Sequence, residues 1–387
     1  MSTSLPDSPL NNSLKARRAA QLDLSFLAVV LILSLGGLLT ILSASAPAAQ
    51  MQQHNSLFYF QRQALWCVLG FGALVLGATV KLSLLRRWSK PLMLATGVLL
   101  LATHLPGLGV SELGASRWIR LGPLSLQPSE LAKLAIVVYA SDLLARFGPD
   151  GWTPVQLRQI LLPLGGVLGM VLFQPDLGST IVLGATAFVL FFCNGTRLRA
   201  MAMTALAGFA GVAYMSWSTP YQRLRLLSFV NPWADPRGSG FQLVQSLMAI
   251  GSGGVLGEGW GQGKQKLFWL PIQYADFIFA AFAEEMGLIG GVCLLALFMF
   301  LAWRGFAIAG QSREPFHSLL VIGLTTTVVL QALINIGVVT ASLPTTGIPL
   351  PFMSFGGTSL LATLFSMGLI LNVSRNAQRQ LLLVQNA

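Results

Sequence analysis

Residues 24–44 read "LSFLAVVLILSLGGLLTILSA" and contain no charged side chain. A run of about 20 apolar residues is long enough to cross the hydrocarbon core of a bilayer as a helix. Nine further apolar candidates follow along the 387-residue chain, and the third, fifth and sixth of all ten are short or broken by Gly. We therefore predict an all-α polytopic integral membrane protein with about ten transmembrane helices. The other nine candidate spans cover residues 63–80, 89–104, 128–147, 158–173, 177–193, 198–217, 275–303, 316–340 and 355–373.

The composition agrees with a membrane protein. Hydrophobic residues make up 54% of the chain and charged residues only 10%, whereas soluble domains carry about 25% charged residues. The net charge is +11, but the basic residues are scattered between the apolar stretches. This pattern is typical of the positive-inside rule and argues against a nucleic-acid partner. The three cysteines and three histidines have neither disulfide nor zinc-binding spacing.

The charges of the loops orient the predicted bundle. With both termini in the cytoplasm, fifteen of the 24 Lys and Arg residues fall on the cytoplasmic side and eight on the other. Because cytoplasmic loops carry the excess of positive charge, we predict that both termini are cytoplasmic. No cleavable signal pattern precedes the first span. The predicted organisation is a single membrane domain (23–376) with a large extracytoplasmic loop (218–274), between two cytoplasmic tails (1–22 and 377–387).

Seven of the eight external basic residues lie in two loops, 105–127 and 218–274. Two explanations are open: an anionic ligand binds on that face, or the longer loop escapes the rule because long loops translocate regardless of charge. Within it, residues 241–250 ("FQLVQSLMAI") predict a short interfacial helix. Its apolar face is expected to hold Phe241, Val244, Leu247 and Met248, opposite Gln242, Gln245 and Ser246.

Three carboxylates interrupt the apolar stretch "QYADFIFAAFAEEMGLIGG" at 273–291. On one helix, Asp276 and Glu284 share a face of small residues, about 12 Å apart along the axis, and Glu285 points to the opposite side. Asp276 is expected at the outer membrane boundary, where a substrate can reach it. Glu284 and Glu285 are interpreted as supporting groups that pair with basic or hydroxyl groups between helices.

The segment "GASRWIRLGPLSLQPSELAKLA" at 114–135 combines external Arg117 with a helix start at Pro128. An Arg, a Lys and a helix N-terminus together favour binding of a phosphate group, which assigns Arg117 and Lys133 to a substrate site. The alternative is that Lys133 only pairs with Glu130, three residues earlier, and locks the helices together.

Two further stretches have unusual patterns for a helix bundle. In "FQPDLGST" (173–180), Asp176 is expected to cap a helix. The stretch "NIGVVTASLPTTGIPLPFMSFGGTSL" (335–360) is rich in Pro, Gly and Thr. Broken backbone at membrane depth is tolerated only where protein buries it or where it lines a cavity.

Five of these stretches together resemble the SEDS family (shape, elongation, division and sporulation), from about residue 20 to residue 376. The resemblance rests on "QPSELAKLA", "QPDLGST", "NPWADPRGSGFQLVQSL", "DFIFAAFAEEMG" and "LPTTGIPLPFMSFGGTS". It implies a ten-span peptidoglycan glycosyltransferase of the plasma membrane. Such an enzyme polymerises the lipid-linked precursor lipid II on the outer face and releases undecaprenyl pyrophosphate. The stretch "GKQKLFWLP" resembles the cell-division branch of the family, which works at the septum, more than the elongation branch.

The resemblance also implies roles for individual residues. Asp276 matches the family's catalytic Asp, although Ile272, Tyr274 and Ala275 replace the usual residues before it. The implied substrate-binding residues are Arg117, Lys133, Arg225, Lys266 and Gln174, and the implied supporting residues are Glu130, Asp176, Glu284, Glu285 and Ser354.

Partners and a cofactor follow from the same resemblance. The implied partners are lipid II with the growing glycan chain, a class B penicillin-binding transpeptidase and other divisome membrane proteins. A divalent cation, Mg²⁺ or Mn²⁺, is a candidate cofactor. Three other functions are open: a lipid II flippase, an elongation-type polymerase and a non-catalytic division scaffold. A flippase usually has paired repeats, and the sequence shows no paired halves.

Overall fold

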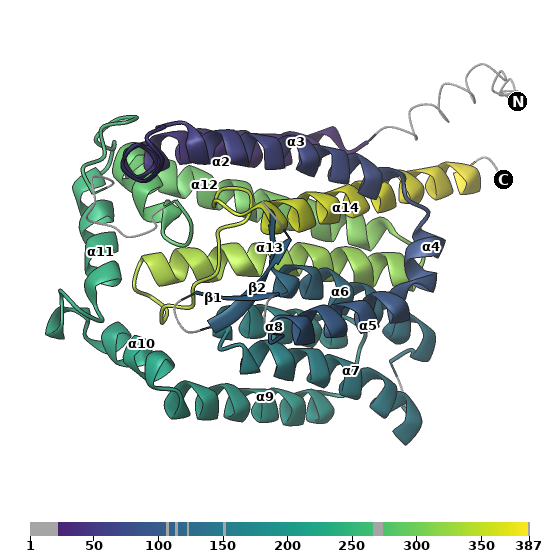
Figure 1. Cartoon of the computed structure of the whole chain (residues 1–387). Helices are drawn as coiled ribbons and strands as arrows, with labels where there is room; N and C mark the ends of the chain where they lie inside the picture. Colours follow the sequence, from purple (N-terminus) through teal and green to yellow (C-terminus); the bar gives the residue numbers. More distant parts are fainter. Residues whose placement is uncertain are drawn as a thin grey trace, which may run out of the picture.

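The computed structural model describes residues 22–105, 108–112, 115–121, 124–149, 152–265 and 274–385. In this part of the chain, ten long helices occupy the ten stretches predicted to cross the membrane, which confirms the polytopic all-α architecture (Figure 1). They are α2 (Leu24–Gln53), α3 (Phe58–Thr79), α5 (Ser89–Ala102), α6 (Pro128–Phe147), α7 (Pro154–Phe173), α8 (Leu177–Cys193), α9 (Leu198–Ser218), α12 (Ile278–Gln311), α13 (Pro315–Val339) and α14 (Gly357–Gln385).

Most of these helices are apolar enough to cross a bilayer. Among the described residues, six are long and apolar enough by length and composition, and α5 and α8 are shorter apolar helices. Helix α6 carries charged side chains, yet its Glu130, Lys133 and Asp142 are all buried by protein. Charged groups inside a membrane bundle face the protein interior and pair there. Helix α6 therefore occupies the interior, packed against α5, α8 and α13.

The two ends of the bundle differ in their connections. The short helix α4 (Leu82–Arg87) and the far end of α14 lie at one end, where the sequence places the cytoplasm (Figure 1). Ion pairs join helices there, including Arg86 to Asp142 (2.8 Å) and Arg86 to Glu314 (3.3 Å). Helix α14 continues to Gln385, beyond the predicted end of the membrane domain at residue 376.

The loop at 105–127 contains strands that the sequence analysis missed. Strands β1 (Gly109–Glu112), β2 (Ala115–Leu121) and β3 (Leu124–Leu126) form an antiparallel sheet in the order β1-β2-β3. Ile119 is buried next to exposed Arg120, which is the inside-outside alternation of a strand. This alternation is only a few residues long, so it gives no signal in a sequence dominated by apolar runs long enough to cross a membrane.

The described part of the long outer loop is mostly helical. It holds α10 (Pro220–Val230), the 3₁₀ turn η1 (Pro232–Ala234) and α11 (Phe241–Gly253), and α11 packs against α12 (Figure 1). The predicted helix is present, and residues from both of its predicted faces are buried. Val244 is buried together with Gln245 and Ser246, whereas Met248 is 46% exposed. The polar side can be buried because the hydroxyl of Ser246 donates to the Val339 carbonyl at 2.7 Å.

Helix α12 differs from the prediction at both its start and its middle. It begins at Ile278, so Asp276 lies in the preceding turn and the helical face expected for Asp276 and Glu284 does not exist. The helix also breaks at Gly287, whose φ is +66°. At the break, the N–H groups of Glu258 and Gly259 donate to the carbonyls of Glu284 (3.0 Å) and Glu285 (3.1 Å). The glycine-rich part of the loop thus satisfies backbone groups that the broken helix leaves open.

Residues 340–356, between α13 and α14, are not helical and pass through the interior, as the Pro- and Gly-rich pattern predicted. Ile348, Leu350 and Met353 are each at most 2% exposed. The amide groups of Gln331 and Asn335 on α13 donate to the carbonyls of Pro349 and Ile348, both at 2.8 Å. We call residues 340–356 the inner segment. Its buried backbone is held by side chains of the neighbouring helix, as membrane depth requires.

Candidate active site

Asp276 sits in a turn whose backbone is fixed at three successive residues. The carbonyl of Tyr274 accepts the N–H of Phe355 (2.8 Å), that of Ala275 accepts the hydroxyl of Ser354 (2.6 Å), and that of Asp276 accepts the amide of Asn335 (2.7 Å). The hydroxyl of Ser354 also accepts the N–H of Leu350. The inner segment and α13 therefore set the position of the turn that carries Asp276, and Ser354, a residue predicted to have a supporting role, takes part through its hydroxyl.

Arg225, on α10, lies beside Asp276 with Gly347 of the inner segment between them. A Cβ atom on Gly347 would stand 3.4 Å from Oδ2 of Asp276 and 3.5 Å from Nη1 of Arg225. Gly347 has φ +72°, a conformation that residues with a side chain rarely adopt. Nη1 of Arg225 also donates to the Thr345 carbonyl at 3.5 Å. Three distant parts of the chain thus bring an acid and a cation together over a residue without a side chain.

The electrostatic surroundings of Asp276 are mixed. Asp276 precedes the membrane-spanning helix and is partly exposed. Burial by the surrounding protein raises the pKa of its carboxyl group, the charges of Arg225 and Arg117 lower it, and the charge of Asp176 raises it; the net direction is upward. No described residue donates a hydrogen bond to this carboxylate. A carboxylate with a raised pKa and an open oxygen is suited to accept a proton.

Arg117, on β2, is anchored to the turn before α8. Its Nε donates to the Gln174 carbonyl at 3.1 Å and its Nη2 donates to the Pro175 carbonyl. Gln222 of α10 donates to the same Pro175 carbonyl at 2.7 Å. The predicted substrate contact Gln174 is only 1% exposed, and its amide donates to Leu100 and Thr103. In the structure, the backbone of Gln174 holds Arg117 and its side chain faces the protein.

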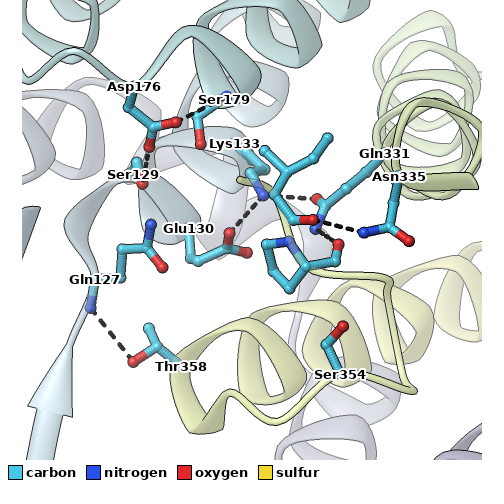
Figure 2. A network of polar contacts seen from close by, with 12 residues as sticks. Gln127, Ser129, Glu130, Lys133, Asp176, Ser179, Gln331, Asn335, Ser354 and Thr358 are labelled. Atoms are coloured by element: carbon cyan, nitrogen blue, oxygen red, sulfur yellow. Dashed lines mark hydrogen bonds and ion pairs between the residues drawn. The ribbon is translucent and has the colours of Figure 1, made fainter. Parts of the chain in front are cut away.

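Lys133 is buried, at 5% exposure, and belongs to a polar network with Glu130 and Gln331 (Figure 2). Its Nζ is 2.6 Å from Oε1 of Glu130 and 2.6 Å from Oε1 of Gln331. Gln331 in turn holds the Pro349 carbonyl of the inner segment. A cavity of about 20 Å³ beside this pair has room for roughly one water molecule. This placement agrees with the alternative reading, in which Lys133 and Glu130 lock helices, and it connects Lys133 to the inner segment through Gln331.

The other supporting carboxylates have defined partners. Asp176 caps α8 as predicted, because its Oδ1 accepts the N–H of Ser179 at 3.1 Å, and Ser129 donates to its Oδ2 at 3.3 Å (Figure 2). Glu285 accepts the hydroxyl of Ser43 on α2 at 2.5 Å, the interhelical partner that was expected.

The partner of Glu284 is of another kind. Its carboxylate accepts the backbone N–H groups of Lys264 (2.7 Å) and Gln265 (3.1 Å), because the outer loop folds back onto α12. Lys266, a predicted substrate contact, lies outside the described residues.

Sequence reasoning missed three residues that shape the site: Gln331, Asn335 and Gly347. Gln331 and Asn335 are four apart within an apolar span, so they share a helix face. A pair of amides at membrane depth is by itself a signal of a buried contact. Gly347 carries no such signal, because a single glycine in a Pro- and Gly-rich stretch does not reveal which side chains lie beside it.

The replaced residues before Asp276 have a structural explanation in part. The ring of Tyr274 stacks on Tyr59 of α3, with centroids 4.4 Å apart, and both rings contact Phe355 edge-on. Tyr274 thus joins an aromatic cluster of α3 and the inner segment. Ala275 contributes its backbone carbonyl, which needs no particular side chain.

The described residues do not fit a divalent cation held by protein ligands alone. Among them, no group of three or more His, Cys, Asp or Glu side chains is placed to hold a metal ion. Asp176, whose charge Asp276 senses, already accepts hydrogen bonds from Ser179 and Ser129. Among the described residues, the cationic groups that act on Asp276 are the guanidinium groups of Arg225 and Arg117.

Fold and site together define a class: a polytopic membrane protein with a carboxylate and basic side chains at the outer end of its bundle. Residues 23–379 match the sequence pattern of the FtsW, RodA and SpoVE family, described as "Cell cycle protein", and the chain belongs to this family.

Individual relatives cover nearly the whole chain. The probable peptidoglycan glycosyltransferase FtsW of Geobacter metallireducens is 37% identical over 371 residues, which are 94% of this chain and 98% of that protein. Stage V sporulation protein E of Bacillus subtilis is 40% identical over 357 residues, or 91% of this chain and 97% of that protein.

Solved structures have the same fold. A chain from a study of the structural coordination of polymerization and crosslinking by a peptidoglycan synthase complex matches with a TM-score of 0.74 and 30% identity, covering 92% of this chain and 98% of that one. The rod shape determining protein RodA of Thermus thermophilus matches with a TM-score of 0.68 and 28% identity, covering 92% and 97%.

Proposed function

We propose that this protein is a peptidoglycan glycosyltransferase that polymerises lipid II into glycan chains during septal cell-wall synthesis. The observation that carries the proposal is the pair of Asp276 and Arg225, which flank Gly347 at the outer end of the bundle. A carboxylate that is partly exposed beside a guanidinium group supplies a base and an anion-binding group within one site. The relationship to proteins named as peptidoglycan glycosyltransferases supports this reaction class.

The reaction needs a base because a sugar hydroxyl is a poor nucleophile. The 4-hydroxyl of the GlcNAc of one lipid II attacks the anomeric carbon of the MurNAc at the growing end. Asp276 accepts the hydroxyl proton as the new C–O bond forms and the bond from that carbon to the pyrophosphate oxygen breaks. The raised pKa of Asp276 brings the proton affinity of its carboxylate closer to that of the hydroxyl oxygen that loses the proton. The partial exposure of Asp276 gives the substrate access to it.

The leaving group determines the role of the cations. Undecaprenyl pyrophosphate gains negative charge as it departs, and positioned guanidinium groups stabilise that charge. Arg225 is held by the Thr345 carbonyl and Arg117 by the carbonyls of Gln174 and Pro175. Both are therefore oriented before the substrate arrives. No step of this mechanism uses a metal ion.

Localisation and partners follow from the proposed reaction. The relatives named FtsW favour a role in division, at the septum of the plasma membrane. A glycan polymerase needs a crosslinking enzyme beside it, and we assign this role to a class B penicillin-binding transpeptidase. A similar chain comes from a complex that coordinates polymerization and crosslinking, which supports this assignment.

The decisive experiment uses the purified full-length chain in liposomes with labelled lipid II. The wild-type protein and the Asp235→Asn variant, altered at an exposed carboxylate of the outer loop, are expected to form a ladder of glycan chains, whereas Asp276→Asn is not. The protein is assayed with and without the transpeptidase. Movement of lipid II between leaflets without polymer would replace this proposal with a flippase. Absence of both activities, with and without the partner, would favour a scaffold.

A further inference from the structure

A groove of about 660 Å³ runs between α5 and α7, away from the site described above. One stripe of α5 lines it, from Lys90 to Leu101, and one stripe of α7 faces it, from Arg158 to Met170. Tyr139 of α6 contributes to the groove, and its hydroxyl donates to the Gln159 carbonyl. Leu94 (72% exposed) and Leu162 (69% exposed) form its rims and face outward from the bundle. The groove therefore opens toward the bilayer.

The two cations of the groove lie at one end, and apolar side chains line most of the remainder. Lys90 is in the first turn of α5 and Arg158 in the second turn of α7, and both helices begin at the cytoplasmic end of the bundle. Neither cation forms an ion pair or a hydrogen bond with any described residue. A helix N-terminus disfavours a nearby positive charge. An anionic group between Lys90 and Arg158 compensates both charges.

The length of the groove matches one leaflet of the bilayer. From Lys90 to Leu101 the helical rise is about 17 Å, and half of the hydrocarbon core is about 15 Å thick. Gly97 and Gly166 line the groove, and a Cβ atom on either would meet nothing within 4 Å. The glycines leave room for a hydrocarbon chain that runs along the helices from the charged end.

We infer that this groove binds an anionic glycerophospholipid of the cytoplasmic leaflet. Its phosphate lies between Lys90 and Arg158, and one acyl chain lies along the stripe that contains Gly97 and Gly166. Basic pockets between transmembrane helices on the cytoplasmic side are suited to such headgroups. The occupant is a lipid rather than a protein segment because the groove is one leaflet long, apolar along its length and charged at the headgroup level.

The first test removes the charges. The full-length protein in detergent is titrated with dioleoyl-phosphatidylglycerol, and bound lipid is counted by native mass spectrometry. Each basic residue near an anionic headgroup contributes about fivefold, so Lys90→Ala with Arg158→Ala is expected to weaken binding about 30-fold. The matched control is Lys81→Ala with Arg87→Ala, which removes two exposed cytoplasmic cations that do not line the groove. An equal loss in the control would overturn the inference, since attraction to the basic surface alone would then explain binding.

The second test fills the groove while keeping the charges. Gly166→Leu places a side chain in the path of the acyl chain and is expected to reduce phosphatidylglycerol binding at least tenfold. Gly169→Leu is the control on the same helix, because its Cβ also meets nothing within 4 Å but the residue does not line the groove. Unchanged binding in Gly166→Leu, with both variants folded, would contradict the inference.

Two other lipids complete the test. Dioleoyl-phosphatidylcholine shares the phosphate but has no net charge, and it is expected to bind at least tenfold more weakly than phosphatidylglycerol. Equal binding of the two would refute the requirement for an anionic lipid. Undecaprenyl phosphate is the competitor: displacement of phosphatidylglycerol at substoichiometric amounts would show that the groove prefers a polyprenyl carrier, and the glycerophospholipid assignment would be wrong.

Discussion

Two aspartates at opposite ends of the bundle have contrasting surroundings. The carboxylate of Asp142, at the cytoplasmic end, is fully buried and accepts hydrogen bonds from Arg86, Arg146 and Ser89, each at 2.8 Å. Asp276, at the outer end, is partly exposed and its carboxylate accepts no hydrogen bond from a described residue, although the charges of Arg225 and Arg117 act on it.

The difference in hydrogen bonding distinguishes a carboxylate with a structural role, Asp142, from one that is available for a reaction, Asp276. At Asp142, every oxygen has a donor, and the network links α4, α5 and α6 and, through Arg86, reaches Glu314. At Asp276, the protein holds the backbone and leaves the carboxylate oxygens open to a ligand. A satisfied carboxylate stabilises a fold, whereas one held by its backbone alone is prepared for chemistry.

Asp276→Asn has the largest expected effect, because the amide cannot accept the proton of the attacking hydroxyl. We expect a loss of roughly 10²–10⁴-fold in the rate of lipid II polymerisation, measured by gel separation of labelled glycan chains. Thermal unfolding should stay close to that of the wild type. A variant that polymerises at the wild-type rate would show that another group is the base.

Arg225→Gln removes the cation beside the acid and should slow polymerisation about 10²–10³-fold. Arg225→Lys keeps the charge but loses the planar fork, and it should recover only part of the rate. Steady-state rates at saturating lipid II measure the effect on the reaction step. If Arg225→Lys and Arg225→Gln prove equally active, charge at this position is not needed.

Asp142→Ala is expected to have the reverse effect of Asp276→Asn: it should lower stability and leave activity unchanged. Removing the carboxylate leaves two guanidinium groups without their main partner, but both are partly exposed and Arg86 keeps Glu314. We expect a loss of about 2–3 kcal/mol in stability, measured by thermal unfolding in detergent. Activity per folded molecule should be retained, and a specific loss of polymerisation without destabilisation would remove the distinction drawn between the two aspartates.

Gly347→Ala tests the gap between acid and cation. The positive φ costs a residue with a side chain about 1–2 kcal/mol, and the added methyl group occupies the space between Asp276 and Arg225. The strain lowers stability, whereas the methyl group between acid and cation is expected to lower activity roughly tenfold, which is about 1.4 kcal/mol in the activation barrier. Gly254→Ala, also at positive φ but with nothing within 4 Å of its Cβ, controls for backbone strain. Equal loss in both variants would assign the effect to strain.

The pH dependence gives the smallest and most specific effect. The base must be ionised, and burial raises the pKa of Asp276 above its ordinary value, so polymerisation should fall as the pH drops through that raised pKa. Because Arg225 lowers this pKa, Arg225→Gln should move the acid limb of the rate profile to higher pH. An unmoved acid limb would mean that the two groups do not interact electrostatically.

The helical architecture was largely predictable from the sequence because apolar length is a direct signal in a membrane protein. Helices α6 and α8 begin and end at the predicted residues, 128–147 and 177–193, since Pro128 and the cap Asp176 mark their starts. The small sheet was missed because its strands are shorter than any span. The start of α12 was misjudged because hydropathy does not distinguish a turn from the first turn of a helix.

The candidate site was predictable in its residue types but not in its arrangement. Asp276, Arg225 and Arg117 come from three separate elements, and only the fold places them together. Gln174 was predicted to bind substrate because it lies in a stretch that resembles the family. In the structure, its side chain points into the protein and its amide donates to Leu100 and Thr103. A sequence indicates which groups are costly to bury, but the direction of a side chain depends on partners far along the chain.

The break in α12 at Gly287 has a consequence for how the protein is made. The carbonyls of Glu284 and Glu285 and the N–H groups of Leu288 and Ile289 all bond to residues 254–259. Unbonded backbone groups are costly in a bilayer, so α12 is complete only when the outer loop is docked against it. Because residues 254–259 leave the ribosome before 284–289, the loop reaches the outer face first. The docked outer loop thus serves as the template on which the following span finishes folding.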